Sequence, residues 1–407
     1  MNDTRTALVI GGGIAGPVAA MALRKAGIKA TVYEAYAGSA DGVGGGLSIA
    51  PNGQNALAVL GAADVVTRIG LPVTSMVLQN SSGRQLAQFP TSPPDLPVMQ
   101  FVWRPELYRA LADEAAGRGI HTEHGKRLVG LDNDRDGVTA HFADGTHAHA
   151  DVLVGADGIR STTRSLIDAN APQPRYTKLI SFGGSTDDMG LPSTNGAMYF
   201  MFGRRAFFGY QVDDDASGGW FVNLPSDEAL TRAQCLEIPP REWLARLRDV
   251  FAKDAGPALR IVERTKPEDL IVVGAMEDVP TVPTWHKGRV VLVGDAAHAT
   301  SPSSGQGASL AMESAVQLAR CLRDLPHDKA FTAFEDLRRT RVEKIIALAA
   351  RTNNDKAAGP VARVFRDVAM LAMMKLVNPE KMAQKFDWQF NYRIDWDAPV
   401  TGALVAA

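Results

Sequence analysis

The chain alternates between short apolar runs and stretches of helical periodicity, most clearly near its two ends. Residues 6–10 form an apolar run, and a helical pattern up to about residue 25 separates it from a second run over 28–33. The runs over 152–155 and 290–293 are also apolar and rich in β-branched residues. Buried strands separated by helices are typical of a parallel sheet, so this pattern predicts an α/β fold.

The middle of the chain has a different pattern, because residues 172–283 contain short aromatic-rich segments joined by turns. This pattern indicates an antiparallel meander. Strands are predicted over 197–202, 206–212 and 219–224, near 73–79, 85–88 and 98–102, and as a hairpin over 137–142 and 147–154. Helices are predicted over 53–60, from residue 104, and over 240–252, 329–357 and 360–377.

Composition narrows the class of protein. The chain has 407 residues, a net charge of -2, 45% hydrophobic and 22% charged residues, so it has no charge excess that would attract nucleic acid. Cys235 and Cys321 are its only cysteines, which favours a reducing compartment without disulfides. No apolar run is long enough to span a membrane, and no signal-peptide pattern opens the chain. We therefore expect a cytoplasmic protein without membrane contact, and we assign no metal ligands.

A glycine motif follows the first strand. Residues 11–16 read Gly-Gly-Gly-Ile-Ala-Gly, the G-x-G-x-x-G spacing between a strand and a helix. Gly11 permits the tight turn, Gly13 lets the backbone approach a pyrophosphate, and Gly16 permits close helix–strand packing. Glu34 ends the second strand, where its carboxylate suits a ribose and would repel a 2′-phosphate. An ordinary glycine turn is the alternative, but the flanking strand, helix and acid favour a Rossmann-like domain that binds the adenosine of FAD or NAD.

A second site is predicted around Asp295. This carboxylate follows the run over 290–293, at the strand end where open α/β sheets bind ligands, and it suits sugar hydroxyls. Residues 305–307 then open a helix with Gly-Gln-Gly, so free N–H groups and the positive end of the helix dipole suit a ring system that gains negative charge. Together these features predict a site for a reduced flavin.

Three further segments are candidates for the same sheet edge. The glycine-rich loop over 42–46 is either a flexible connection or a wall of the cofactor site. Arg104, at a helix start, is either a surface charge or a contact to a phosphate or the ribityl chain. Asp157-Gly158 follows the run over 152–155, with Arg160 and Arg164 one helical turn apart, and is either a plain strand-end turn with surface arginines or part of the site.

Three motifs occur in a fixed order along the chain: the glycine motif, the Gly-Ala-Asp-Gly segment over 155–158, and the Gly294-Asp295 segment with Pro302. With these motifs the chain resembles the p-hydroxybenzoate hydroxylase-like (group A) FAD-dependent aromatic monooxygenases. The resemblance spans residues 5 to about 345. Many relatives carry Asn shortly after the last G-x-G, where this chain has Ala308-Ser309. The cofactor-binding candidates are Gly11, Gly13, Ile14, Ala15, Gly16, Glu34, Gly45, Arg104, Asp157, Asp295, Pro302, Gly305, Gln306 and Gly307.

The resemblance implies an oxidoreductase that hydroxylates an aromatic or polycyclic small molecule. FAD would be reduced by NAD(P)H, which binds transiently because no second glycine motif is present, and O2 would add at flavin C4a to give a hydroperoxide. Such chemistry needs a dry cavity, and Tyr199, Tyr210 and Trp220 on the meander are the substrate-binding candidates. Tyr199, Tyr210 and His298 are the candidates for a base or relay. His298 is better explained as a structural hydrogen-bonding residue, so we assign no catalytic residue.

The predicted domains are a discontinuous FAD-binding domain, an inserted antiparallel substrate domain and a C-terminal helical segment. Their ranges are 1–72, 104–171 and 284–345 for the first, 73–103 and 172–283 for the second, and 346–407 for the third. Within the last, residues 361–374 form an amphipathic methionine-rich stretch, interpreted as a docking helix, with a membrane or partner surface as the alternative. Trp388, Tyr392 and Trp396 predict a tail that is held by aromatic packing.

Two other functions remain open. A non-oxygenating reductase or dehydrogenase of the same fold would use the same flavin site, and a flavin-binding protein without catalysis would need only the cofactor motifs. The chain has no Cys-x4-Cys pair, which excludes the disulfide reductase type, and no Trp-x-Trp motif of the flavin halogenases.

Overall fold

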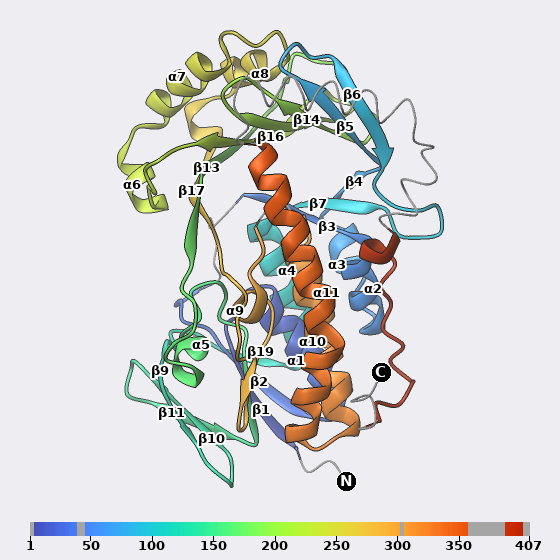
Figure 1. The fold of residues 1–407 in the computed structure, drawn as a ribbon, viewed down its shortest axis with the longest axis vertical. Helices are drawn as coiled ribbons and strands as arrows, with labels where there is room; N and C mark the ends of the chain where they lie inside the picture. Colours follow the sequence, from blue (N-terminus) through green and yellow to red (C-terminus); the bar gives the residue numbers. More distant parts are fainter. Residues whose placement is uncertain (1–3, 39–44, 302–304, 357–386, 402–407) are drawn as a thin grey trace.

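A computed structural model describes residues 4–38, 45–301, 305–356 and 387–401 of the chain (Figure 1). Its lower half contains a six-stranded sheet, in which five strands are parallel and the edge strand β18 is antiparallel to its neighbour. In spatial order the strands are β18 (His286–Lys287), β19 (Val290–Leu292), β12 (Val152–Gly155), β1 (Thr6–Ile10), β2 (Lys29–Tyr33) and β8 (His121–Glu123). The predicted parallel sheet is thereby confirmed.

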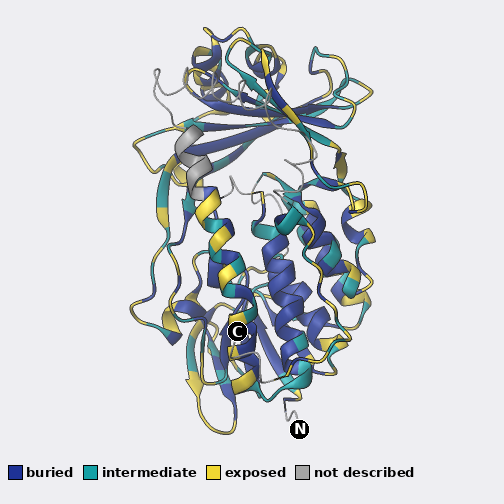
Figure 2. Cartoon of the chain, turned by 45° about the vertical axis from the view of Figure 1, so that its right-hand side comes forward, coloured by how far each residue is buried: buried dark blue, intermediate teal, exposed yellow. Residues whose placement is uncertain are grey.

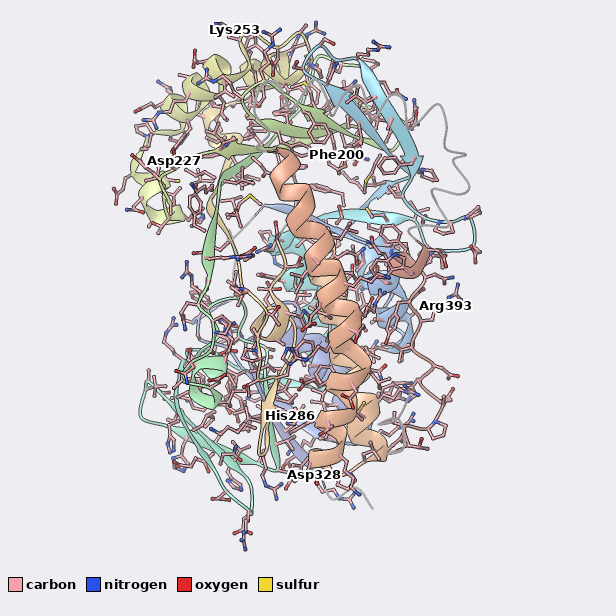
Figure 3. All side chains as sticks on the ribbon, in the orientation of Figure 1. Phe200, Asp227, Lys253, His286, Asp328 and Arg393 are labelled. Atoms are coloured by element: carbon pink, nitrogen blue, oxygen red, sulfur yellow. The ribbon has the colours of Figure 1, made fainter. Side chains whose placement is uncertain are left out.

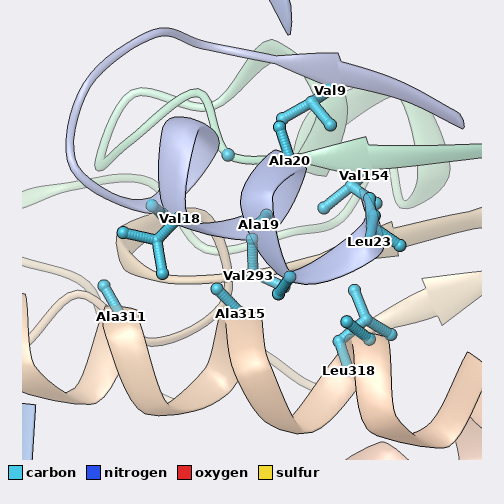
Figure 4. Close-up of a cluster of buried hydrophobic side chains, with 14 of the residues drawn as sticks. Val9, Val18, Ala19, Ala20, Leu23, Val154, Val293, Ala311, Ala315 and Leu318 are labelled. Atoms are coloured by element: carbon cyan, nitrogen blue, oxygen red, sulfur yellow. The ribbon is translucent and has the colours of Figure 1, made fainter. Parts of the chain in front are cut away.

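The helices of this half cover the sheet with small apolar side chains. Helix α1 packs between the sheet and α10, and Figure 4 shows Ala19 of α1 and Ala311 and Ala315 of α10 at this contact. Because these side chains are small, the two helix axes can approach closely, and both helices are almost completely buried (Figure 2). The helices are α1 (Ala15–Lys25), α2 (Pro51–Val59), α3 (Asp64–Thr67), α4 (Arg104–Gly117), α5 (Thr162–Ile167), α9 (Asp295–His298), α10 (Gly307–Asp324) and α11 (His327–Lys356).

The upper half contains a seven-stranded sheet that is antiparallel except where β14 pairs with β5. In spatial order its strands are β17 (Leu270–Asp278), β13 (Arg175–Thr186), β16 (Gly218–Pro225), β15 (Phe207–Val212), β14 (Ala197–Phe202), β5 (Ser75–Asn80) and β6 (Gln85–Pro90). Helices lie against its outer face (Figure 1): α6 (Arg232–Glu237), α7 (Pro240–Phe251), α8 (Ala258–Arg264) and the short 3-10 helix η1 (Pro267–Asp269). The predicted inserted antiparallel sheet is confirmed.

Two three-stranded sheets complete the fold. One contains β3 (Gly46–Ile49), β7 (Met99–Trp103) and β4 (Leu71–Val73), so the proposed domain boundary at residue 72 falls within a strand. The other contains β11 (His147–Ala150), β10 (Val138–Phe142) and β9 (Leu128–Asn133). The hairpin prediction over 137–142 and 147–154 was wrong at its end, because residues 152–155 form β12 of the parallel sheet. Asp151 separates the two strands, since its Oδ2 accepts hydrogen bonds from the backbone N–H groups of Arg5 and Thr6.

The C-terminal tail lies against α10 and α11. The ring of Trp388 lies 3.9 Å from Lys344 Nζ, that of Tyr392 lies 4.3 Å from Arg341 Cζ, and that of Trp396 lies 5.1 Å from Arg323 Cζ. The predicted aromatic anchoring is thereby confirmed. Residues 391–401 are not helical, so the helical prediction for 346–407 is wrong there, because side chains instead of helical partners bind the backbone. The methionine-rich stretch over 361–374 lies outside the described residues.

Among the helices described, none combines the length and the apolar character that a membrane crossing requires.

Candidate active site

The glycine turn after β1 has the geometry of a phosphate cradle. Gly11 has φ +104°, and a Cβ atom on Gly16 would overlap the Gly11 carbonyl oxygen, so neither position accepts a side chain. A Cβ on Gly13 would meet no atom nearer than Tyr108 Cζ at 4.0 Å, so the space above it is open. Helix α1 begins after Ile14 without a side-chain cap or an acid in its first turn. Its free N–H groups fit an anion such as a pyrophosphate.

Glu34 lies beside this turn at the carboxyl end of β2. Its Oε2 accepts a hydrogen bond from the Gly12 N–H at 2.6 Å, and its Oε1 accepts one from the Tyr36 N–H at 2.9 Å. These backbone donors hold the carboxylate next to the open space above Gly13. The position fits a group that binds the hydroxyls of a ribose.

Asp295 follows β19 of the same sheet, three residues after the strand ends, and is the first residue of α9. Strands β12 and β1 lie between β19 and β2, so three strand spacings of ~4.8 Å separate the strands that lead to the two acids by about 14 Å across the sheet. The Asp295 side chain is exposed, yet protein on its other sides limits its hydration and raises its pKa, an effect that nearby Arg104 and Arg164 oppose. One extended dinucleotide can therefore contact both acids, with the glycine turn between them.

Arg104 and Tyr108 lie on the first turns of α4, with Arg104 near Asp295 and Tyr108 near both acids. Burial raises the pKa of Tyr108, as do the charges of Asp295 and Glu34, whereas Arg104, which is hydrogen-bonded to it, opposes the rise. The Arg104 Nε is buried and has no hydrogen-bond partner within the described ranges. Arg104 is thus not a surface charge, and it lies near Tyr108 and Asp295 beside the open space above Gly13, hereafter called the groove. The sequence analysis missed Tyr108, although its spacing of four from Arg104 on a helix was a usable signal.

Asp157 contributes to the site indirectly, through hydrogen bonds at the start of α5. Its carboxylate accepts hydrogen bonds from the hydroxyl of Ser161 (2.5 Å) and from the N–H and the hydroxyl of Thr163 (2.9 and 3.0 Å), and so holds the start of α5. Arg164 on that helix is buried and donates to the Ala296 carbonyl at 3.1 Å, next to Asp295. Of the two arginines, only Arg160 lies at the surface, as a plain strand-end turn would place it, and there it pairs with Glu277.

The start of α10 is held by a buried polar network. Gln306 has an uncapped N-cap position, and its Oε1 accepts a hydrogen bond from Asn52 Nδ2 at 2.9 Å. The same Nδ2 donates to Glu313 Oε1 at 2.5 Å. Asn52 therefore connects α2 with two positions on α10. Gly305 has φ +60°, and a Cβ on Gly307 would lie 4.0 Å from Asp295 Oδ1, so the helix start adjoins Asp295. Pro302 lies outside the described residues.

Glu313 is itself the centre of a charge cluster that the sequence analysis missed. Its carboxylate lies 2.5 Å from Arg338 Nη1 and 2.9 Å from Arg341 Nη2, and Glu313 and Arg338 are fully buried. Burial would raise the pKa of Glu313, but the two arginines hold it below its usual range. Arg341 also donates to the carbonyls of Trp388 and Gln389, so the network extends into the C-terminal tail. A charged residue among the apolar positions of α10 was the available signal.

His298 has the structural role favoured in the sequence analysis. Its Nε2 lies 2.9 Å from Ser314 Oγ, and its ring packs against Trp285. Burial and the charge of Arg338 lower the pKa of His298 to about 3. An imidazole with this pKa is a weak base at neutral pH, which argues against a catalytic base at this position.

The glycine loop reaches the groove at Gly45, whose carbonyl accepts a hydrogen bond from the Arg104 N–H at 3.2 Å. A Cβ on Gly46 would overlap the ring of Phe101. Residues 39–44 of the loop lie outside the described residues. No cluster of side chains suited to hold a metal ion is found in the described ranges.

A cavity of 260 Å³ lies between the β3–β7–β4 sheet and the inner face of the seven-stranded sheet. Its walls include aromatic rings and glycines, and Trp103 connects it to the groove because Arg104 follows directly. The lining residues are Leu71, Phe101, Trp103, Ser185, Thr186, Asp187, Met198, Tyr210, Gln211, Asp213, Ser217, Gly218, Gly219, Trp220 and Phe221.

Tyr199, Tyr210 and Trp220 lie on the opposite, helix-covered face of this sheet. Side chains alternate between faces along a strand, and all three pack with the core beneath α7 and α8. Tyr210 and Trp220 border the cavity, but the Trp220 ring stacks on Phe208 and its Nε1 donates to Thr265. Burial raises the pKa of Tyr210, which disfavours a phenolate there. The inner face instead presents Phe200, Phe207, Gln211 and Phe221 (Phe200 is labelled in Figure 3).

Comparisons with known proteins agree with this geometry. Residues 4–216 and 260–347 match the family described as FAD binding domain. The chain is 32% identical over 370 residues to an FAD-dependent urate hydroxylase from Klebsiella pneumoniae, covering 87% of this chain and 90% of the relative. It is 30% identical to an aurachin C monooxygenase/isomerase from Stigmatella aurantiaca, covering 85% and 88%. The crystal structure of Klebsiella pneumoniae HpxO with FAD and uric acid superposes with a TM-score of 0.79 at 26% identity, covering 95% and 96%. The chain therefore belongs to the p-hydroxybenzoate hydroxylase-like family of FAD-dependent aromatic monooxygenases, and its cofactor is FAD.

Proposed function

We propose that this enzyme uses NAD(P)H and O2 to hydroxylate a small aromatic molecule in the cavity beneath the seven-stranded sheet. The observation that carries the proposal is the continuity of two sites: Trp103 lines the cavity and Arg104 lies in the dinucleotide groove. Relatives of this chain are named urate hydroxylase, salicylate hydroxylase and 6-hydroxynicotinate 3-monooxygenase. A single aromatic ring or a fused pair of rings is therefore the proposed substrate class, and a larger polycyclic substrate stays a prediction.

The proposed FAD contacts follow the sheet edge. Gly11, Gly13 and Gly16, with the start of α1 at Ile14 and Ala15, would hold the pyrophosphate, and Glu34 would bind the adenosine ribose. Asp295 and Arg104 would contact the ribityl chain, with Tyr108 packed beside them. Gly305, Gln306 and Gly307 would direct free N–H groups at the ring, with Gly45 on the opposite side. Asp157 would act indirectly, by holding α5 and thereby α9.

Bound FAD supplies electron transfer from NAD(P)H and the activation of O2. The chain supplies a cavity with apolar rings on several walls, which limits water near the reacting atoms. The uncapped start of α10 supplies positive potential where negative charge develops. His298 and Tyr210 are poor proton acceptors for the reasons given above, so we propose no side-chain base.

The experiment is an oxygen-labelling assay with FAD-loaded protein. Aromatic compounds are screened for accelerated NAD(P)H oxidation, and the mass of the product formed under ¹⁸O2 is measured by mass spectrometry. The proposal predicts one labelled oxygen atom per product. Substrate-dependent NAD(P)H oxidation that continues without O2 and leaves the product unlabelled would support the reductase alternative. Apart from the boundary at residue 72 and the helical character of residues 391–401, which the structure contradicts, the domain ranges stay predictions, as does the cytoplasmic location.

A further inference from the structure

The cavity beneath the seven-stranded sheet presents acceptors and, among the residues that the structure describes, no positive charge. No Lys, Arg or His occurs among the residues that line it, as far as the described ranges extend. Its polar side chains are those of Gln211, Asp213 and Asp187, the hydroxyls of Tyr210 and of three Ser or Thr residues, and the indoles of Trp103 and Trp220. The binding of an aromatic carboxylate would require a cation at this position, because a buried anion is stable only when it is paired.

Gln211 has an unsatisfied acceptor. Its side chain is 5% exposed, and its Nε2 donates to the Pro72 carbonyl at 3.2 Å. This bond fixes the orientation of the amide, because the oxygen could not take the place of the donor. Oε1 is left buried without a hydrogen-bond partner among the described residues. Buried acceptors are almost always paired, so a donor from a bound molecule is the expected partner.

Asp213 is a second acceptor, and no ion pair of its carboxylate is found in the part of the chain that the structure describes. It follows β15 two residues after Gln211 and is half-buried, whereas its neighbours Asp187 and Asp188 are paired with Lys266 and Arg264. Burial raises the pKa of Asp213, and the charges of Asp215 and Asp214 raise it further. A positive or donor group in the cavity would relieve both effects.

We propose that the substrate is a neutral or cationic aromatic molecule that donates hydrogen bonds to Gln211 and Asp213, and that aromatic anions are rejected. The inference rests on the proposed function, because it treats this cavity as the substrate site. Gln211 and Asp213 are then specificity-determining residues. A ring N–H or a phenolic O–H would satisfy Gln211, and a protonated amine or a second donor would satisfy Asp213.

The test compares three indoles that share one ring system and one ring N–H: tryptamine, 3-methylindole and indole-3-acetate. Each is titrated into FAD-loaded protein, and binding is followed by the change in flavin absorbance. We expect indole-3-acetate to bind at least about tenfold more weakly than tryptamine, with 3-methylindole between them. Gln211→Leu should weaken binding of all three, because the ring N–H loses its acceptor.

Charge reversal provides the control. Asp213→Lys should reverse the order of tryptamine and indole-3-acetate, whereas Asp227→Lys should leave it unchanged, because Asp227 is 97% exposed and is not among the residues that line the cavity. Equal binding of the anion and the amine to the wild type, identical behaviour of the two lysine variants, or no absorbance change with any indole would overturn the inference. Labelled oxygen in the product of an aromatic anion would also overturn it and would leave the proposed function intact.

Discussion

Trp103 and Arg104 are consecutive residues whose side chains reach two different sites. Strand β7 ends at Trp103, whose ring lines the cavity 3.3 Å from where a Cβ on Gly219 would lie. Helix α4 begins at Arg104, whose guanidinium lies near Tyr108 and Asp295 in the groove. One peptide bond at a strand–helix junction therefore separates the proposed substrate and cofactor contacts.

This relationship predicts a separation of binding defects. Trp103→Leu should weaken binding of an aromatic substrate about tenfold and leave FAD affinity unchanged, because only the cavity wall is lost. Arg104→Met should weaken FAD binding about tenfold or more, because the groove loses a charged donor. Flavin fluorescence measures the FAD affinity, and titration of the FAD-loaded protein with an aromatic substrate measures the substrate affinity. If both variants impaired FAD binding equally, the two sites would not be separate.

The glycine turn predicts different outcomes for two of its residues. Gly13→Leu should leave the thermal stability of the cofactor-free protein nearly unchanged and abolish FAD binding, because its side chain would project into open space. Gly16→Ala should destabilise the cofactor-free protein, by about 3 kcal/mol or more, because its Cβ would overlap a backbone carbonyl. Thermal unfolding without FAD distinguishes the two. An unfolded Gly13→Leu protein would mean that the space above Gly13 is not open.

The cofactor half of the site could be predicted from the sequence because its signals are local. Gly11, Gly13 and Gly16 lie within six residues, Glu34 directly follows an apolar strand, and Asp295 comes three residues after the end of another. The substrate half could not be predicted. Aromatic residues occur on both faces of β14 and β15, so the alternation does not reveal which face is covered by helices. Tyr199 accordingly packs on the helix-covered face, and neither it nor its neighbour Phe200 is among the residues that line the cavity.

Polar contacts between residues far apart in the chain could not be predicted from the sequence either. Asn52 and Glu313 are 261 positions apart, and nothing in either local sequence indicates that they meet. Tyr108 becomes part of the groove only because the first turns of α4 lie near Glu34 and Asp295, at the edge of the parallel sheet.

The raised pKa of Asp295 predicts that this carboxylate lowers the stability of the cofactor-free protein at neutral pH while it contributes to FAD binding. Its pKa is raised in the folded protein, so its contribution to stability is present below the unfolded pKa and is lost as the pH rises through the folded value. At pH 7 the cofactor-free Asp295→Asn protein should therefore unfold at a higher temperature than the wild type, by roughly 1–2 °C because the carboxylate is partly hydrated. The difference should shrink towards pH 4, and FAD affinity should fall.

Differential scanning fluorimetry from pH 4 to pH 8 provides this measurement. Asp227→Asn is the control, because that carboxylate is almost fully exposed. A lower unfolding temperature of Asp295→Asn at pH 7 would show that the carboxylate stabilises the cofactor-free fold through Arg104 and Arg164.

The buried pair of Glu313 and Arg338 predicts strong coupling. Glu313→Gln should cost about 3 kcal/mol or more, because it leaves Arg338 buried without its carboxylate, whereas Arg338→Met should cost less, because Arg341 still pairs with Glu313. The double variant should lose less than the sum, with a coupling energy on the order of 2 kcal/mol. The control is Glu242 with Arg246, which has the same 2.5 Å separation on an exposed helix surface and should couple by no more than about 0.5 kcal/mol. Similar coupling in both pairs, measured by urea unfolding, would contradict this account.

A crystal structure of the FAD-loaded protein tests the central claim most directly. The account predicts one FAD molecule along the sheet edge, with its adenosine ribose on Glu34, its pyrophosphate above Gly13, its ribityl chain on Asp295 and its ring beside the start of α10. An adenosine bound away from Glu34, or a ring that does not reach Gly307, would contradict it.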